Sequence, residues 1–181
     1  MSSVQLVRLE ESSERKSFDC GDSDLNEFFF EDSKGHSAQL LAVTYAYEVD
    51  GETVAFFSVL NDSIRKQELT RADYKKLTEG IPHKKNYSSH PAVKIGRFAV
   101  AEKFQGQGHG KDRINFIKAF FIIKNKTGCR FITLDAYEGA VGFYNKNGFK
   151  YLTIDDEGKT RRQMYLDLKP LASVIPRSIK E

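Results

Sequence analysis

Apolar residues follow two patterns along the chain, one typical of strands and one typical of helices. The order in which the two patterns alternate predicts a mixed α/β domain. Apolar, β-rich runs predict strands at residues 4–9, 40–49, 53–61, 92–100, 130–136, 149–154 and 163–168. Apolar residues at helical spacing predict helices at 70–78, 113–124 and 140–147, preceded by a short one that follows an N-cap at Asp22 or Ser23. No repeat or Pro/Ser-rich linker interrupts the pattern, so we expect one domain over residues 1–168 and a tail over 169–181.

Turn signals separate these elements. Asp50 and Gly51 form a dipeptide typical of a β-hairpin turn between the second and third predicted strands. Residues 80–91 contain two prolines and two adjacent lysines, and we expect them to form a loop. The long helix should end at Lys126 and Gly128, because glycine favours the left-handed conformation found at helix C-termini.

Composition excludes several classes of protein. The 181 residues are 40% hydrophobic and include 14 Phe and 8 Tyr, which is enough for a core and argues against disorder. No apolar run approaches the ~18–20 residues of a membrane-spanning helix, and residues 1–11 lack a basic-then-apolar secretion signal. Cys20 and Cys129 lie far apart and form no C-x-x-C, so we expect a cytoplasmic protein without a disulfide scaffold, a zinc ribbon or membrane association.

The net charge of +3 hides an asymmetry along the chain. Residues 1–62 carry a charge of −9, and the remainder carries +12, of which +6 falls on residues 63–97. This split favours an anionic ligand or partner for the later part of the chain. A solvated surface whose charges offset each other is an equal alternative.

A glycine cluster lies between a predicted strand and the long predicted helix. Its sequence, Q-G-Q-G-H-G at residues 105–110, allows positive φ angles and a close approach of backbone N–H groups to a ligand. Because the first N–H groups of a helix are unpaired and carry the positive end of its dipole, such a loop can bind a diphosphate. A Walker loop is excluded by Gln105 and Asp112, and a Rossmann loop by Lys111 and Arg113. A turn that binds nothing is the alternative.

A second motif lies about one strand and one helix downstream. It reads Ala140-x-x-Phe143-Tyr144-x-x-x-Gly148-Phe149, in which a glycine ends a helix and leads into an apolar residue. Taken alone, the tyrosine is more typical of the rim of a core than of an acid. The spacing between this motif and the glycine cluster, however, favours a functional role for the tyrosine.

Together the two motifs resemble the GNAT superfamily of acetyl-CoA-dependent N-acetyltransferases. Gln105-x-x-Gly108-x-Gly110, preceded by the strand at 95–100, is similar to the family's Q/R-x-x-G-x-G/A loop, and the second motif is similar to its A-x-x-F-Y-x-x-x-G-F segment. The resemblance covers roughly residues 4–168. It implies the GNAT fold: a mixed, mostly antiparallel sheet of six to seven strands, flanked by about four helices and splayed near the cofactor.

A narrower resemblance concerns the start of the chain. The pattern F-x-C-G-x-x-x-L-N-x-F at residues 18–28 and G-R-x-A-V at 96–100 is similar to the GNAT toxins of toxin–antitoxin pairs. Those toxins acetylate the α-amine of aminoacyl-tRNA and are held by a ribbon-helix-helix antitoxin. Two departures stand out: Arg113 takes a position where the family usually has Leu, and Lys111-Asp112 is more charged than usual.

The resemblance also implies roles for individual residues. An amine would attack the thioester of acetyl-CoA directly in a ternary complex, without a metal. Tyr144, with an ordinary pKa near 10, would protonate the leaving thiolate. The residues implied to bind acetyl-CoA are Phe98, Ala99, Val100, Gln105, Gly106, Gln107, Gly108, His109, Gly110 and Lys111.

The general base is not evident from the sequence. The strand at 92–100 contains no carboxylate, and its polar side chains are Lys94 and Arg97. Glu102 and Glu138 are the nearest candidates, but Asp135-x-x-Glu138 resembles a helix-capping pair. A lysine amine near pKa 10.4 would need deprotonation, whereas an α-amine near 7.7–8.0 is already partly neutral at physiological pH. We therefore expect an α-amine on an anionic carrier, and aminoacyl-tRNA fits better than a lysine-rich peptide.

Several basic residues are candidates for contacts with RNA phosphates, and their main alternative is simple solvation. They are Arg71, Lys75, Lys76, Lys84, Lys85 and Arg97. The residues expected to bind the acceptor substrate are Lys84, Lys85, Lys94 and Arg97. The acidic residues between Glu10 and Asp24 are candidates for binding a basic antitoxin segment. A homodimer, the role of the tail, a metabolite amine as acceptor, and a non-catalytic acetyl-CoA sensor all remain open.

Overall fold

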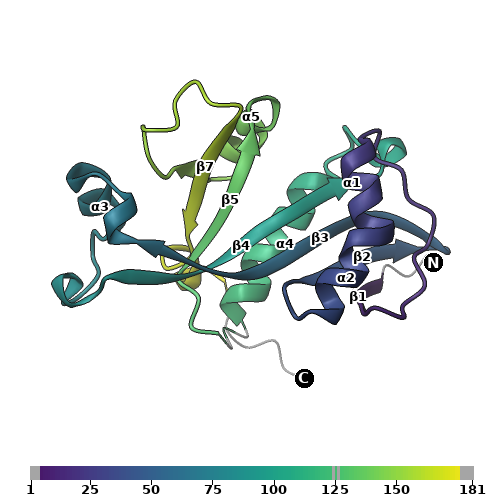
Figure 1. The fold of residues 1–181 in the computed structure, drawn as a ribbon, viewed down its shortest axis with the longest axis horizontal. Coiled ribbons are helices and arrows are strands. Elements are labelled where there is room, and N and C mark those ends of the chain that lie inside the picture. Colours follow the sequence, from purple (N-terminus) through teal and green to yellow (C-terminus); the bar gives the residue numbers. More distant parts are fainter. Residues whose placement is uncertain (1–4, 124, 126, 176–181) are drawn as a thin grey trace. The chain divides into compact units, whose positions relative to one another are not determined.

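The computed structural model describes residues 5–123, 125 and 127–175. Its strands are β1 (Gln5–Leu9), β2 (Val43–Val49), β3 (Glu52–Arg65), β4 (Ser89–Val100), β5 (Phe131–Tyr137), β6 (Lys150–Tyr151) and β7 (Arg161–Asp167). Its α-helices are α1 (Ser23–Glu27), α2 (Ser33–Ala38), α3 (Arg71–Leu77), α4 (His109–Ile123) and α5 (Glu138–Lys146) (Figure 1). The predictions for Val4, Lys124, Lys126 and 176–181 fall outside the described residues. Within the described part, none of the helices has the length and apolarity needed to cross a membrane.

The strands form one mixed sheet, as expected. Their order is β1-β2-β3-β4-β5-β7-β6. The pairs β1–β2, β2–β3, β5–β7 and β6–β7 are antiparallel, and β4 pairs with β5 in parallel. That parallel ladder joins Ala92–Lys94 to Phe131–Thr133, so the part of β4 after Lys94 extends beyond it.

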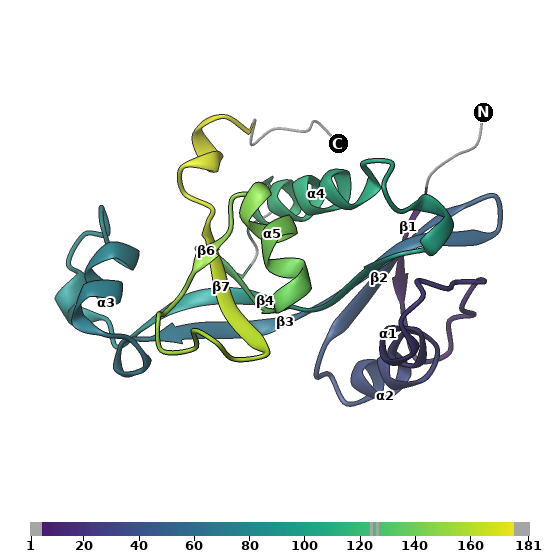
Figure 2. The same ribbon diagram turned by 90° about the horizontal axis from the view of Figure 1, so that it is seen from above.

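Two compact units make up the predicted domain of residues 1–168 and the described start of the tail. The first unit comprises Met1–Leu60 and Ile95–Phe116, and the second comprises Asn61–Lys94 and Ile117–Glu181. β3, β4 and α4 each contribute residues to both units. β1, β2, α1 and α2 belong to the first, whereas α3, α5, β5, β6 and β7 belong to the second (Figures 1 and 2).

Aromatic rings form the core of the first unit. The ring of Phe56 on β3 lies 5.2 Å from that of Phe18, 5.0 Å from Phe29 and 6.1 Å from Phe28, measured between centroids. All four side chains are buried. Asp22 begins the helical segment, as predicted, by accepting a hydrogen bond from the Leu25 N–H at 3.0 Å. The segment continues beyond α1 through a wider π-helical turn, Phe28–Asp32, and buries two consecutive phenylalanines.

Replacing Phe56 by alanine should destabilise the protein by about 3–5 kcal/mol, because the cavity would lie among three other rings. Urea denaturation followed by circular dichroism measures this loss. Phe30→Ala is the matched control, since Phe30 is only partly buried and packs at the edge of the same cluster. An equal loss for both variants would show that Phe56 is not the centre of this core.

The second unit is built on the antiparallel pair β5 and β7, which are joined in the chain through α5 and β6. The buried side chains Ile132, Leu134 and Ala136 alternate along β5 with Asp135 and Tyr137, which are exposed. Helix α5 packs against β5 and β7. A separate cluster joins Ile64, Leu77, Ala92, Phe131 and Tyr165, so the short helix α3 is anchored to the strands by Leu77.

Several element boundaries differ from the predictions. α4 begins at His109 rather than residue 113, and β4 begins at Ser89 rather than 92. β6 contains two residues instead of the predicted 149–154, and one further backbone hydrogen bond follows it, from the Leu152 N–H to the Gln163 carbonyl at 2.9 Å. Beyond that bond, side chains act as the acceptors. Thr153 accepts from the Asp155 N–H at 3.1 Å, and Asp156 accepts from the Gln163 N–H.

Candidate active site

The glycine loop leads directly into α4 in the first unit. Gly106 and Gly108 have φ angles of +73° and +89°, which L side chains rarely adopt. A Cβ on either glycine would have open space around it, so the backbone conformation and not crowding requires glycine there. The first helical hydrogen bond runs from the Asp112 N–H to the Gly108 carbonyl at 3.1 Å. The preceding N–H groups of the helix therefore point out of its N-terminus.

Gln105 fixes the loop to its surroundings. Its side-chain amide donates to the carbonyl of Val100 at 2.9 Å and to that of Cys20 at 3.0 Å. One residue thereby joins the end of β4, the loop and the segment before α1. The loop itself is exposed from Gln105 to Gly108. A rigid, exposed loop that ends in free N–H groups at the start of a 15-residue helix fits a diphosphate.

The end of β4 supplies the strand expected beside this loop. Ala99 is buried, Phe98 and Val100 are half-buried, and Arg97 is exposed with its guanidinium 5.1 Å from the centre of the Phe28 ring. A Cβ at Gly96 would lie 3.0 Å from a methyl carbon of Leu60, so a larger residue there would require the Leu60 side chain to shift.

The charged residue at position 113 is accommodated by an aromatic ring. The guanidinium carbon of Arg113 lies 4.1 Å from the centre of the Tyr47 ring, and Tyr47 is 3% exposed. Burial raises the pKa of Tyr47, which keeps the phenol neutral beside the cation. The start of α4 is therefore packed by a cation–π contact at the position where the sequence resemblance led us to expect leucine.

Tyr144 lies on α5 in the second unit. Its half-buried ring is flanked by Phe143 at 5.2 Å and Phe149 at 5.6 Å, both close to perpendicular. Gly148, with φ +89°, ends the helix as predicted and lets the Phe149 N–H donate to the Tyr144 carbonyl at 3.1 Å. Burial raises the pKa of Tyr144 to about 12, so the phenol keeps its proton at physiological pH.

The predicted capping pair Asp135–Glu138 is wrong. The N-cap of α5 is Tyr137, without a side-chain cap, and the Asp135 carboxylate instead accepts from the Lys94 ammonium at 2.6 Å. This long-range ion pair balances the charge of Lys94, which leaves the ammonium less available to the acceptor substrate than the sequence suggested. Glu138 and Glu102 are both exposed and stay candidates for the base.

The cysteines are free thiols, and burial raises the pKa of both. Cys129 is buried, while Cys20 is half-buried and donates to the Asn26 side chain at 3.2 Å. Low thiolate content argues against either as a nucleophile. Within the described ranges, no cluster of three or more His, Cys, Asp or Glu residues could hold a metal ion.

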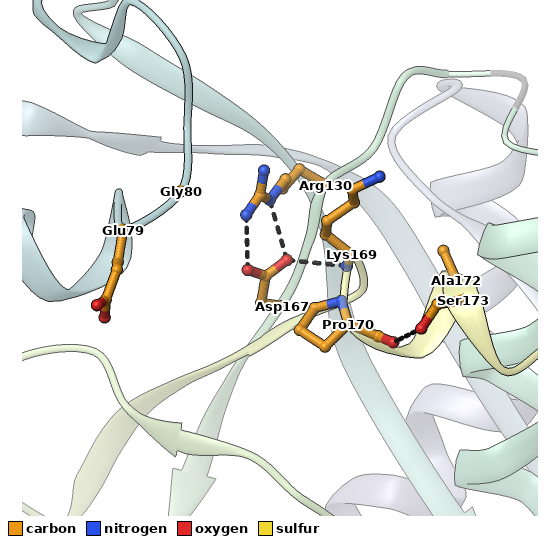
Figure 3. Close-up of a pocket in the computed structure, with 8 residues that line it drawn as sticks. All are labelled: Glu79, Gly80, Arg130, Asp167, Lys169, Pro170, Ala172 and Ser173. Atoms are coloured by element: carbon orange, nitrogen blue, oxygen red, sulfur yellow. Dashed lines mark hydrogen bonds and ion pairs between the residues drawn. The ribbon is translucent and has the colours of Figure 1, made fainter.

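A pocket in the second unit is lined by none of the residues predicted to bind acetyl-CoA or to act in catalysis. It is lined by Glu79, Gly80, Arg130, Asp167, Lys169, Pro170, Ala172 and Ser173 (Figure 3). Arg130 donates to Asp167 through two hydrogen bonds of 3.0 and 2.8 Å, which also hold β5 and β7 together. This bidentate pair balances the charge of the Arg130 guanidinium within the protein.

Comparison with known proteins decides the family. A family model described as an acetyltransferase (GNAT) domain matches residues 41–151, more than half of the chain. The chain belongs to the GNAT acetyltransferase family. It is therefore an acyltransferase, and the GNAT fold expected from the two motifs is confirmed. A comparison with curated proteins finds no significant match.

Solved structures resemble the GNAT fold of this chain over nearly its full length. A protein described as a bacterial toxin aligns with a TM-score of 0.77 at 20% identity, covering 100% of this chain and 99% of its own. AtaT complexed with acetyl-methionyl-tRNAfMet aligns with a TM-score of 0.77 at 19% identity, covering 96% and 100%. A tyrosine-to-phenylalanine variant of KacT aligns with a TM-score of 0.72 at 21% identity, covering 94% and 99%. At these identities the similarity establishes the fold.

Proposed function

We propose that this protein transfers the acetyl group of acetyl-CoA to the α-amine of an aminoacyl-tRNA. The observation that carries the proposal is the loop that opens α4, whose positive φ angles and outward N–H groups fit the diphosphate of coenzyme A. AtaT, which has the same fold, is described both with acetyl-CoA and with acetyl-methionyl-tRNAfMet. These descriptions support the donor and the acceptor proposed here.

The proposed reaction gives separate groups of residues separate roles in binding acetyl-CoA and in transferring a proton. When bound, acetyl-CoA supplies an activated acyl group as a thioester. The N–H groups of His109, Gly110 and Lys111 bind the diphosphate, and the Lys111 ammonium adds a positive charge beside them. Backbone groups of Phe98–Val100 position the pantetheine arm, and one N–H there holds the thioester oxygen. Tyr144 holds a proton on its phenol oxygen for the leaving sulfur.

The choice of an α-amine follows from its acidity. With an ordinary pKa near 7.7–8.0, such an amine is substantially neutral at physiological pH, whereas a lysine amine near 10.4 is not. Glu102 and Glu138, the two candidate bases, are both exposed. An acceptor that needs little help from a base fits this set of residues.

Basic residues of the second unit would bind the RNA backbone. Arg71, Lys75 and Lys76 on α3 are exposed, as is Lys85 in the turn that follows, and Lys84 is half-buried. α3 is held in place by Leu77 and by its N-cap Thr70, which accepts from the Asp73 N–H at 3.1 Å. Phosphate contacts from such a group of cations would make binding sensitive to salt.

A second partner is proposed for the acidic first unit. Glu10, Glu11, Asp22 and Asp24 are exposed there, and a basic peptide complements them in charge. AtaT is described bound to the C-terminus of the antitoxin AtaR, which supports an antitoxin segment as that peptide. Cytoplasmic location and the ribbon-helix-helix class of that antitoxin belong to this same proposal.

The proposed function is tested by offering acetyl-CoA with bulk aminoacyl-tRNA, polyamines and a lysine peptide in parallel. Radiolabelled acetyl groups should appear on aminoacyl-tRNA faster than on either RNA-free acceptor. Faster acetylation of the lysine peptide would overturn the proposed acceptor. Absence of any acetyl-CoA binding by calorimetry would overturn the donor as well.

The pH profile follows from the two titrating groups. With aminoacyl-tRNA, kcat/KM should rise with pH as the α-amine loses its proton and level off above about pH 8. Tyr144 works in its protonated form, and because its pKa is raised to about 12, no decline should occur below about pH 10. Initial rates at saturating acetyl-CoA measure the profile. A decline between pH 8 and 9 would show that Tyr144 is not the proton donor.

A further inference from the structure

We infer that Tyr137 and Arg161 form a stacking platform for a nucleobase at the single-stranded acceptor end of the RNA substrate, an inference that rests on the proposed function. Tyr137 is the last residue of β5 and Arg161 the first of β7, and the antiparallel register places them directly opposite each other. The guanidinium carbon lies 4.5 Å from the centre of the Tyr137 ring, and an Nη donates to the Tyr137 hydroxyl. Tyr137 nevertheless remains 53% exposed.

A neighbouring contact between an arginine and a tyrosine serves as a comparison, because its arginine is held by the protein itself. Arg162 lies 4.1 Å from the centre of the Tyr151 ring, and its Nε donates at 2.9 Å to Asp156, a carboxylate that is 4% exposed. The charge of Arg162 is thus balanced inside the protein. Arg161 forms no ion pair with a carboxylate of the part of the chain that the structure describes.

The platform combines the two properties that single-stranded nucleic acid requires. An exposed aromatic face stacks on any base, and a guanidinium beside it adds a cation–π contact or a phosphate contact. The hydrogen bond from Arg161 restricts the ring of Tyr137, so less rotational freedom is lost when a base stacks on it. A lysine peptide has no planar group for the ring and no negative charge for the guanidinium.

The platform shares one face of the second unit with the proposed phosphate contacts. Phe131, Thr133, Asp135 and Tyr137 follow the same side of β5, because side chains alternate along a strand. Phe131, at the start of that side, belongs to the cluster that anchors α3. The seven residues from Phe131 to Tyr137 span about 20 Å, since each of the six steps between them advances about 3.3 Å. A polynucleotide whose backbone meets the cations of α3 could therefore follow this face with its unpaired end toward Tyr137.

The test compares two uncharged tRNAs as competitive inhibitors of acetylation, one complete and one lacking its unpaired 3′ nucleotides. With the unmodified enzyme, the truncated RNA should bind more weakly, by about 5- to 150-fold per stacked base. Tyr137→Ala should bind the complete RNA more weakly by a similar factor and should no longer distinguish the two RNAs. Its KM for aminoacyl-tRNA should rise by the same factor, with kcat at saturation reduced less than threefold.

Three further variants separate the platform from a structural role. Tyr137→Phe keeps the ring and should restore discrimination between the two RNAs, whereas Arg161→Glu should weaken both binding and discrimination. Arg161→Glu also provides the measurement if Tyr137→Ala does not fold. Tyr151→Ala removes the ring of the neighbouring pair and should discriminate as the unmodified enzyme does.

Each remaining outcome is decisive. If the unmodified enzyme acetylates aminoacyl-tRNA and Tyr137→Ala still distinguishes the two RNAs, the platform is wrong and the proposed function stands. If Tyr137→Ala instead raises the dissociation constant of acetyl-CoA, the ring contacts the adenine of the donor and the inference is overturned. If the unmodified enzyme neither acetylates nor binds tRNA, the proposed acceptor fails and the platform fails with it.

Discussion

Tyr144→Phe is expected to lower turnover by about 10²- to 10⁴-fold, the range typical for loss of a positioned general acid or base. The substitution removes one oxygen from a ring held between Phe143 and Phe149, so packing should be preserved. Acetyl-CoA affinity should stay within about threefold, because the proposed diphosphate contacts come from the loop before α4. Single-turnover assays and isothermal titration calorimetry measure the two quantities separately.

Tyr165→Phe is the matched control for this substitution. Tyr165 lies in the same unit, is 6% exposed, and also has a pKa raised by burial. Removing its hydroxyl should leave turnover within about twofold. If both variants lose activity equally, the effect of Tyr144→Phe reflects the loss of a buried hydroxyl in general and not proton donation.

The same experiment distinguishes an enzyme from a protein that only senses acetyl-CoA. In a sensor, heat of binding would be measurable and acetyl transfer to any acceptor would be absent from the unmodified protein. In an enzyme, Tyr144→Phe separates binding from turnover. Growth arrest on expression of the unmodified chain, absent with Tyr144→Phe, would further support a toxin over an enzyme of metabolism.

Local sequence signals predicted the fold where the physical cause is itself local. Asp50 and Gly51 adopt φ angles of +50° and +83°, as the hairpin turn requires. Asp22 and Gly148 begin and end their helices as expected. The sequence pattern predicts the start of α4 at residue 113, because glycines near a helix end are more typical of a loop. In the structure, however, Gly110 is already part of the helix.

Long-range pairs could not be predicted in this way. Asp135 looked like a cap because its partner, Lys94, is 41 residues away and is reached only through the ladder between β4 and β5. Tyr137 and Arg161 become neighbours only through the register of β5 and β7. The glycine loop and the helix that ends before Gly148, by contrast, could be located from sequence because each is contiguous.

The dependence of RNA binding on salt should be steep and should map to the second unit. If four of its proposed cations contact phosphates, affinity for tRNA should fall about 50- to 150-fold between 50 and 200 mM salt. The double variant Lys84→Glu with Lys85→Glu should reduce the slope of log affinity against log salt by about 2, since each contact contributes roughly one unit. Fluorescence anisotropy of labelled tRNA over a salt series measures both.

A charge change in the first unit provides the comparison for these lysines. Lys34 on α2 pairs with Glu31 at 3.4 Å in the acidic part of the chain, so Lys34→Glu alters the net charge without removing a proposed phosphate contact. Its slope should equal that of the unmodified protein, while its affinity shifts only slightly through the overall charge. A slope that falls equally in all variants would mean that net charge alone governs binding. A slope near zero in the unmodified protein would show that the cations of α3 and of the turn that follows it do not contact the RNA.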